Sequence, residues 1–171
     1  MQERTGLVTL RGTPMTLIGT PLKEKDVSPD ATLLSNDLTP VHLSDYKGKI
    51  CLISSVPSLD TPICDVQTRR FNQEVTQIGN NIHVLTISVD LPFAQKRWCG
   101  ASGMDKVITL SDHRETSFGL AYGILMKELR LLARAVFILD ASGTLQYQEI
   151  VSEIGNEPDF AAALSAIKSI S

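Results

Sequence analysis

Residues 50–56 read ICLISSV, residues 61–78 read TPICDVQTRRFNQEVTQI, and residues 81–89 read NIHVLTISV. The first and third segments are short, largely apolar runs without clean alternation, which is typical of strands buried on both faces. The middle segment has apolar residues at roughly helical spacing, namely Ile63, Val66, Phe71 and Val75. These segments therefore predict a βαβ unit, the crossover that two parallel strands require.

The segments around this unit extend the same organisation. After it we expect a short helix over 91–99, a strand over 106–110, a hairpin of strands at 134–139 and 144–151, and a closing helix over 158–170. The turn of that hairpin is formed by Asp140, Ser142 and Gly143. Before the unit, short apolar stretches broken by Gly and Pro predict an N-terminal β-hairpin and edge strands; they are residues 7–10, 15–18 and 31–34. The order predicts an α/β fold with a mixed β-sheet flanked by helices on both faces.

Composition narrows the class of protein. The chain has 171 residues of which 43% are apolar, which predicts a single domain over residues 1–171. Its 16 basic and 19 acidic residues give a net charge of −3, so we expect neither nucleic acid nor a membrane surface as a partner. The first segment has no apolar run long enough for a secretory leader or a membrane span, so we expect a cytoplasmic protein. The 3 cysteines are too few for a disulfide-stapled scaffold and favour reactive or buried thiols.

Cys64 lies where the predicted strand passes into the predicted helix, in the segment PSLDTPIC at 57–64. Ligand chemistry in α/β sheets concentrates at such strand ends. Thr61 is a favoured N-cap residue and Pro62 suits the first helical position, which puts Cys64 at the third. That position faces the free N–H groups of the helix start and favours negative charge. We therefore expect a thiolate at Cys64, in a pocket open to small oxidants.

The helix start alone does not ionise a thiol. An ordinary thiol, with a pKa of about 8.5, is only about 3% ionised at pH 7, and a helix terminus supplies about 0.3–1 kcal/mol. Arg69 and Arg70 follow Cys64 too far around the helix to reach it. Arg134 is the candidate cation, because it directly precedes an apolar strand where a charge is costly unless paired. The alternative is that Arg134 extends into solvent at the strand end.

Cys99 is the second candidate thiol. Asp90 and Pro92 can start its helix and Gly100 can end it, which places Cys99 in the last turn, where the helix dipole disfavours a thiolate. A thiol in such a place suits the role of a resolving cysteine, which attacks Cys64 after Cys64 has been oxidised. The glycines of residues 100–103 would let the helical turn open. On pattern alone, a small buried hydrophobic residue is the favoured interpretation of Cys99.

Other groups give weaker signals. Cys51 lies inside a predicted strand with no cap, cation or turn nearby, so we expect it to pack in the core. The histidines, at 42, 83 and 113, have no metal-binding spacing with the cysteines, so we expect no metal. The glycines match neither a phosphate loop nor a dinucleotide fingerprint, and we expect no cofactor. Asp60 and Asp65 flank Cys64, but acidic residues in a first helical turn usually balance the helix dipole.

The candidate residues sit in motifs that resemble a known family. The pattern Pro57-x-x-x-Thr61-x-x-Cys64, the segment DLPFAQKRWCG at 90–100 and the segment LLARAVFILD at 131–140 are similar to the thiol peroxidases, the atypical two-cysteine branch of the peroxiredoxins. The first pattern is shared by peroxiredoxins generally, whereas the second is much narrower. The resemblance extends over nearly the whole chain, including VTLRGTPMTLIG at 8–19 and EIGNEPD at 153–159.

The resemblance implies a thioredoxin-like fold with an N-terminal β-hairpin, and usually a homodimer. It implies that Cys64 attacks the peroxide and becomes a sulfenic acid. Cys99 then resolves it into an intrachain disulfide that thioredoxin or a similar dithiol protein reduces. Thr61 and Arg134 match residues that hydrogen-bond the thiolate and orient peroxide, and Pro57 matches one that shields the pocket. The implied function is the reduction of hydrogen peroxide and organic hydroperoxides in antioxidant defence.

Two other classes of function remain open from the sequence. The chain could be a redox-sensing interaction protein whose disulfide changes a partner surface without efficient turnover. It could also be a Cys–His hydrolase that forms an acyl-enzyme at Cys64 and does not need Cys99. Steady-state peroxide consumption distinguishes the first from a peroxidase, and replacement of Cys99 with Ser distinguishes the second.

Overall fold

The computed structural model describes residues 1–104 and 107–171, and in these residues the main sheet has seven strands in the order β10-β9-β5-β6-β7-β3-β4. The strands are β3 (Thr32–Leu34), β4 (Pro40–His42), β5 (Ile50–Ser55), β6 (Ile82–Ser88), β7 (Ile108–Ser111), β9 (Ala135–Leu139) and β10 (Leu145–Ile150). The β5–β6 and β6–β7 pairs are parallel, and the other neighbours in the sheet are antiparallel. The mixed sheet expected from the sequence is confirmed.

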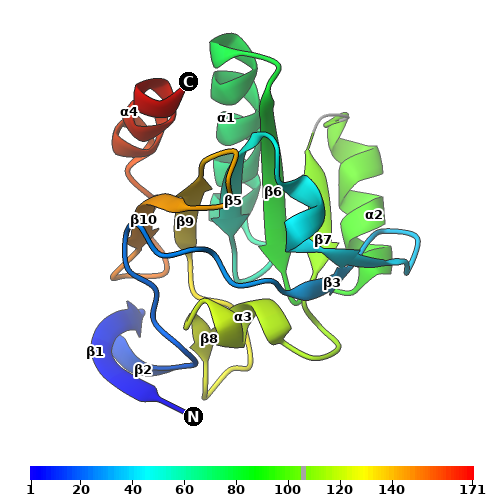
Figure 1. Cartoon of the computed structure of the whole chain (residues 1–171). Helices are drawn as coiled ribbons and strands as arrows, with labels where there is room; N and C mark the ends of the chain where they lie inside the picture. The colour runs from blue at the N-terminus through cyan, green and yellow to red at the C-terminus, as the bar shows by residue number, and fades with distance from the viewer. Residues whose placement is uncertain (105–106) are drawn as a thin grey trace.

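The helices connect and cover these strands (Figure 1). They are α1 (Pro62–Ile78), α2 (Pro92–Ser102), α3 (Ser117–Ala121), α4 (Phe160–Ile170) and a short 3-10 helix, η1 (Leu43–Tyr46). The run β5–α1–β6 is the βαβ unit predicted from the sequence, and α2 joins β6 to β7 in the same way. The strand expected over 106–110 corresponds to β7, with Lys106 outside the described residues.

Alternate residues of the central strands pack into two different apolar cores. On β5, Ile50 and Leu52 join the core formed with α1 and α4, whereas Cys51 and Ile53 join the core on the other face. That second core includes α3 residues and the N-terminal strands. All six residues of β5 are buried. This burial on both faces explains why the strand sequence shows no alternation of apolar and polar residues.

The N-terminal hairpin forms a separate sheet. Strands β1 (Glu3–Leu10) and β2 (Thr13–Ile18) pair antiparallel, and β2 also pairs with β8 (Leu125–Met126), which was not expected from the sequence. Figure 1 shows this sheet at the end of the molecule opposite α4. The carboxylate of Glu153 closes the hairpin turn by accepting hydrogen bonds from Thr9 Oγ1 at 2.7 Å and from the backbone N–H groups of Arg11 and Gly12 at 3.0 and 3.1 Å.

The buried face of α1 includes polar as well as apolar residues. It is formed by Cys64, Gln67, Thr68, Phe71 and Val75, whereas the apolar Val66 is 45% exposed. Gln67 and Thr68 are both hydrogen-bonded, so hydropathy alone does not define this face. In the part of the chain that the structure describes, none of the helices has the length and hydropathy of a membrane span.

Candidate active site

The chain enters α1 through a loop that follows the carboxyl end of β5. Thr61 is the N-cap residue with extended backbone angles and Pro62 is the first helical residue, so Cys64 occupies the third helical position as predicted. The side chain of Thr61 makes no cap hydrogen bond. Its Oγ1 instead donates to the carbonyl oxygen of Ser58 at 3.2 Å. The position of Thr61 is confirmed, but its hydroxyl stabilises the preceding turn rather than the helix end.

The sulfur of Cys64 is fully enclosed. Cys64 is 0% exposed and belongs to a small apolar cluster with Val56 and Leu59, against which the partly buried Trp98 packs. The expectation of an open pocket is therefore wrong for this conformation, because the loop and α2 together cover the sulfur. A molecule from solvent contacts the Cys64 sulfur only when part of this cover moves.

Arg134 directly precedes β9, and its guanidinium points at the enclosed sulfur. Its Nη2 donates to Cys64 Sγ at 3.4 Å, and its Nε donates to the carbonyl oxygen of Ile154 at 2.9 Å. Arg134 is 2% exposed, which rules out the alternative in which its guanidinium extends into solvent. Cys64 and Arg134, the candidate cysteine and the candidate cation, are 70 residues apart in the sequence and are in contact in the structure.

The guanidinium of Arg134 also lacks a conventional counter-charge. Among residues 1–104 and 107–171, no carboxylate oxygen lies within ion-pairing distance of the Arg134 guanidinium. A buried cation without an anionic partner is strongly unfavourable. The sulfur of Cys64, when ionised, is the anion that this site accommodates, and the free N–H groups at the start of α1 favour the same charge.

Gln67 is a site residue that the sequence reasoning missed. It lies three residues after Cys64 on the buried face of α1, and its Oε1 accepts a hydrogen bond from Arg134 Nη1 at 2.6 Å. Its Nε2 donates to Ser54 Oγ at 2.7 Å, which fixes the orientation of the amide. Gln67 therefore positions the guanidinium. A polar residue on the apolar face, one helical turn after the cysteine, is the signal in the sequence that could have identified it.

The loop before Cys64 is anchored by Asp90. Its carboxylate accepts hydrogen bonds from Ser58 Oγ at 2.7 Å and from the N–H of Leu59 at 2.8 Å. The adjacent Pro57 belongs to the same loop and is buried. Asp90 was expected to start α2, but the N-cap is Leu91, because the Asp90 carboxylate is bonded to the loop instead. Asp90 thus links the Cys64 loop to the segment that leads into α2.

Cys99 lies on α2, which is longer than expected. The helix continues through the exposed Gly100 to Ser102, and Gly103 ends it in the left-handed conformation, with a φ of 65°. Gly100 was predicted to end the helix, and that prediction is wrong. Cys99 is partly buried, its Sγ lies 3.4 Å from Thr109 Oγ1, and both Cys64 and Cys99 are free thiols.

Neighbours of the two cysteines bind each other. Trp98, next to Cys99, donates from Nε1 to the Oδ1 of Asp65, next to Cys64, at 2.9 Å. Arg69 pairs with Asp65 at 2.9 Å and donates from Nη1 to the carbonyl oxygen of Ser102 at 3.4 Å. Arg69 therefore helps to join α1 to α2 and does not contact the Cys64 sulfur. These contacts hold α2 against α1 while keeping the two sulfurs in separate surroundings.

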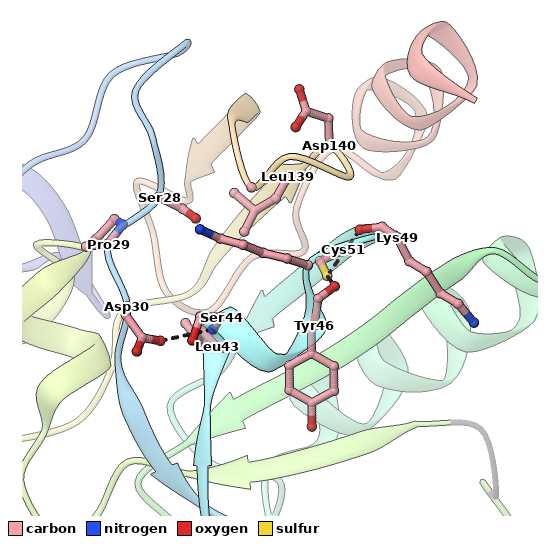
Figure 2. Close-up of a pocket in the computed structure, with 12 residues that line it drawn as sticks. Ser28, Pro29, Asp30, Leu43, Ser44, Tyr46, Lys49, Cys51, Leu139 and Asp140 are labelled. Carbon is pink, nitrogen blue, oxygen red and sulfur yellow. Dashed lines mark hydrogen bonds between the residues drawn. The ribbon is translucent and has the colours of Figure 1, made fainter.

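Cys51 lies at the opposite end of β5 from the loop that leads to Cys64. It is 4% exposed, belongs to the main core as expected, and donates weakly to the carbonyl oxygens of Tyr46 and Lys49 at 3.5 and 3.8 Å. Figure 2 shows it in a pocket with Tyr46, Lys49 and Asp140. Burial raises the pKa of the Cys51 thiol to about 12, so this thiol is unreactive at neutral pH.

Comparisons with known proteins agree with this geometry. The sequence matches the Redoxin family over residues 23–164. It is 57% identical over 158 residues to a thiol peroxidase of Oceanobacillus iheyensis, covering 92% of this chain and 96% of that protein. It is 53% identical over 163 residues to a thiol peroxidase of Bacillus subtilis, covering 95% of this chain and 97% of that one. A peroxiredoxin-like protein from Aquifex aeolicus superposes with a TM-score of 0.89 at 36% identity, covering 98% of this chain and 99% of that one.

The fold defines a protein of the thioredoxin-like class, and its site pairs a buried cysteine at a helix start with a buried arginine. The expected thioredoxin-like fold with an N-terminal hairpin is confirmed by the structural similarity. The chain belongs to the redoxin family and, within it, to the thiol peroxidases of the peroxiredoxin group.

Proposed function

We propose that Cys64 is the residue at which this thiol peroxidase reduces hydrogen peroxide and organic hydroperoxides. The Cys64 thiolate forms a bond to one peroxide oxygen while the O–O bond breaks. The second oxygen leaves with the bonding electron pair and takes up a proton, giving water or an alcohol. The sulfur remains as a sulfenic acid, so the cysteine is oxidised by two electrons and the peroxide is reduced by two.

One observation carries this proposal: the guanidinium of Arg134 lies 3.4 Å from the Cys64 sulfur in a buried site without a carboxylate partner among the described residues. A thiolate is the reactive form of cysteine, and a fixed guanidinium stabilises it. The guanidinium fork has several donors, so it can also bind a substrate oxygen. Gln67 supports this role because it holds the fork in place from the opposite side.

We assign the resolving role to Cys99. Its sulfur attacks the Cys64 sulfenic acid, the S–S bond forms, the S–O bond breaks, and the oxygen leaves as water with the proton of the Cys99 thiol. Proximity supports the assignment, because the adjacent residues Asp65 and Trp98 are hydrogen-bonded. The enclosure of Cys64 by Trp98 means that α2 must move for both peroxide entry and disulfide formation.

Thr61 and Pro57 complete the proposed site. The Thr61 hydroxyl lies at the start of α1, where a change of side-chain rotamer would exchange its bond to Ser58 for one to the thiolate or the peroxide. Pro57 is buried in the loop held by Asp90 and limits access of water to the sulfur. We propose no metal or other cofactor in this cycle.

The remaining elements of the proposal concern partners and location. Thioredoxin or a similar dithiol protein reduces the Cys64–Cys99 disulfide, and the enzyme acts as a homodimer in the cytoplasm. Three free cysteines favour a reducing compartment. The enzyme forms a single domain over residues 1–171, since the main sheet combines strands from residue 32 to residue 150.

The test is to treat the reduced protein with one equivalent of hydrogen peroxide and to measure its intact mass and peptide map. We expect a loss of about 2 Da and a peptide that joins Cys64 to Cys99. A stable gain of about 16 Da on Cys64, or of about 32 Da after a second equivalent, with Cys99 still free would contradict the resolving role. Steady-state peroxide consumption with a thioredoxin system then measures turnover. Near-zero turnover with a normal disulfide would favour a redox sensor instead.

A further inference from the structure

The Cys99 thiol lies in a small polar seat built from three separate elements. Its Sγ, on α2, is 3.4 Å from Thr109 Oγ1 on β7 and 3.9 Å from Asn36 Nδ2 in the turn between β3 and β4. Thr109 Oγ1 also donates a hydrogen bond to Asn36 Oδ1 at 2.9 Å. The three side chains therefore contact one another in a closed ring.

The ring holds the sulfur from two sides. A threonine hydroxyl carries one proton, and Thr109 gives it to Asn36 Oδ1, so the lone pairs of Thr109 Oγ1 face Cys99. Asn36 Nδ2 donates toward the same sulfur. Cys99 therefore breaks contacts with two side chains when it leaves this position.

The turn that carries Asn36 holds α2 at a second point. Asp37 pairs with Lys96 of α2 at 3.0 Å. Both side chains of this pair are mostly exposed, so solvent screens it and it contributes little by itself. The partly buried contacts of Cys99 and the exposed pair of Lys96 nevertheless oppose the same movement, namely the departure of α2 from β7 and from the turn between β3 and β4.

Cys99 must leave this seat to reach Cys64. A disulfide requires its two Cα atoms within about 7 Å and a specific Sγ–Sγ geometry. In this structure Cys64 Sγ is bonded to Arg134, whereas Cys99 Sγ is bonded to Thr109 and Asn36, and both thiols are free. We propose that Thr109 and Asn36 are positioning residues of the resolving step, which hold Cys99 in its seat and set the rate of its release. This inference rests on the proposed function of Cys64 and Cys99.

Thr109→Val tests the seat, and the adjacent strand provides a matched control. Valine keeps the shape of threonine but removes the acceptor for the Cys99 thiol. Thr86 on β6 is the parallel register neighbour of Thr109, it is 0% exposed, and its Oγ1 has no hydrogen-bond partner in the described residues. Thr86→Val therefore makes the same chemical change on the same pair of strands without breaking a bond to the seat.

The measurement is the fate of the Cys64 sulfenic acid under a range of hydrogen peroxide concentrations. Rapid quenching and mass spectrometry give the ratio of disulfide, about 2 Da lighter, to sulfinic acid, about 32 Da heavier. Loss of one hydrogen bond predicts that this ratio rises about two- to tenfold in Thr109→Val, with Thr86→Val like the wild type. The ratio is independent of how fast Cys64 is first oxidised. Failure of the wild type to form any sulfenic acid would instead reject the proposed function.

Asn36→Ala provides a second test. Asn36 is partly exposed in the turn between β3 and β4, and alanine removes its Nδ2 donor to Cys99 Sγ. Loss of this contact should ease the release of Cys99, so the ratio of disulfide to sulfinic acid should again rise about two- to tenfold. A ratio in Thr109→Val and Asn36→Ala equal to that of Thr86→Val would overturn the inference.

Discussion

Replacement of Arg134 with Met tests the central contact of the site. The change removes the donor to Cys64 Sγ at 3.4 Å and the donors to Gln67 and to the Ile154 carbonyl, while methionine fills much of the same buried space. Arg130→Met is the matched control, because it removes the same charge from an exposed position four residues earlier. Arg134→Lys keeps the charge but loses the fork, and we expect it to be intermediate.

The expected magnitude follows from these contacts. A hydrogen bond to a charged group contributes about 1.5–3 kcal/mol, which corresponds to about a 10- to 150-fold loss in the rate of thiolate oxidation. Gln67 Oε1 is left buried without its donor, which costs about 1–3 kcal/mol of stability.

The assay is single-turnover oxidation of Cys64 by hydrogen peroxide, followed by quenching and mass spectrometry. It is carried out without urea, where all variants are folded. Urea unfolding of the same proteins separates the loss of reactivity from the loss of stability. We expect Arg130→Met to react like the wild type. An Arg134→Met protein that is folded and oxidised as fast as the control would refute the argument that this guanidinium stabilises the reactive thiolate.

Three further predictions follow from other parts of the structure. Trp98, the single tryptophan of the chain, packs against the Cys64 cluster, so peroxide should change its fluorescence; a signal that is the same before and after oxidation would contradict the proposed movement of α2. Burial raises the pKa of Asp112 to about 6 from 3.8, so the folded state holds this proton more tightly and the free energy of unfolding should fall as pH rises from about 4 to about 6. Asp112→Asn should lack this contribution in urea titrations, and a variant with the wild-type slope would count against it. Hydrogen bonds from Thr9 and the nearby backbone hold the pKa of Glu153 at about 2, below 4.5, so its contribution to stability should be lost as pH falls from about 4.5 to about 2. Glu153→Gln should show a smaller acid-induced loss than the wild type, and an equal loss would show that the carboxylate does not stabilise the hairpin turn.

Local chemistry explains why some of the site was predictable from the sequence. The preference of Thr61 and Pro62 for a helix start placed Cys64 correctly at the third helical position of α1. The apolar strand after Arg134 indicated that its charge needed a partner. The placement of Cys64 depends on neighbours in the chain alone, whereas the choice of Arg134 also relied on the resemblance to the thiol peroxidases.

The features that the sequence reasoning missed depend on tertiary contacts. Gln67 resembles any polar residue of an amphipathic helix until Arg134 and Ser54 are placed beside it. Asp90 is a good N-cap by residue type, but bonds to Ser58 and Leu59 take its carboxylate away from α2. The pairing of β8 with β2 involves only two residues of β8, too short a segment to show a strand period.

The placement of both candidate thiols on helices of one chain, with Asp65 bonded to Trp98 between them, has a kinetic consequence. In the proposed cycle, disulfide formation after oxidation is a first-order process. Its rate constant should therefore be unaffected by diluting the enzyme. A cell could then keep this peroxidase at low abundance without slowing the closure of each individual catalytic cycle.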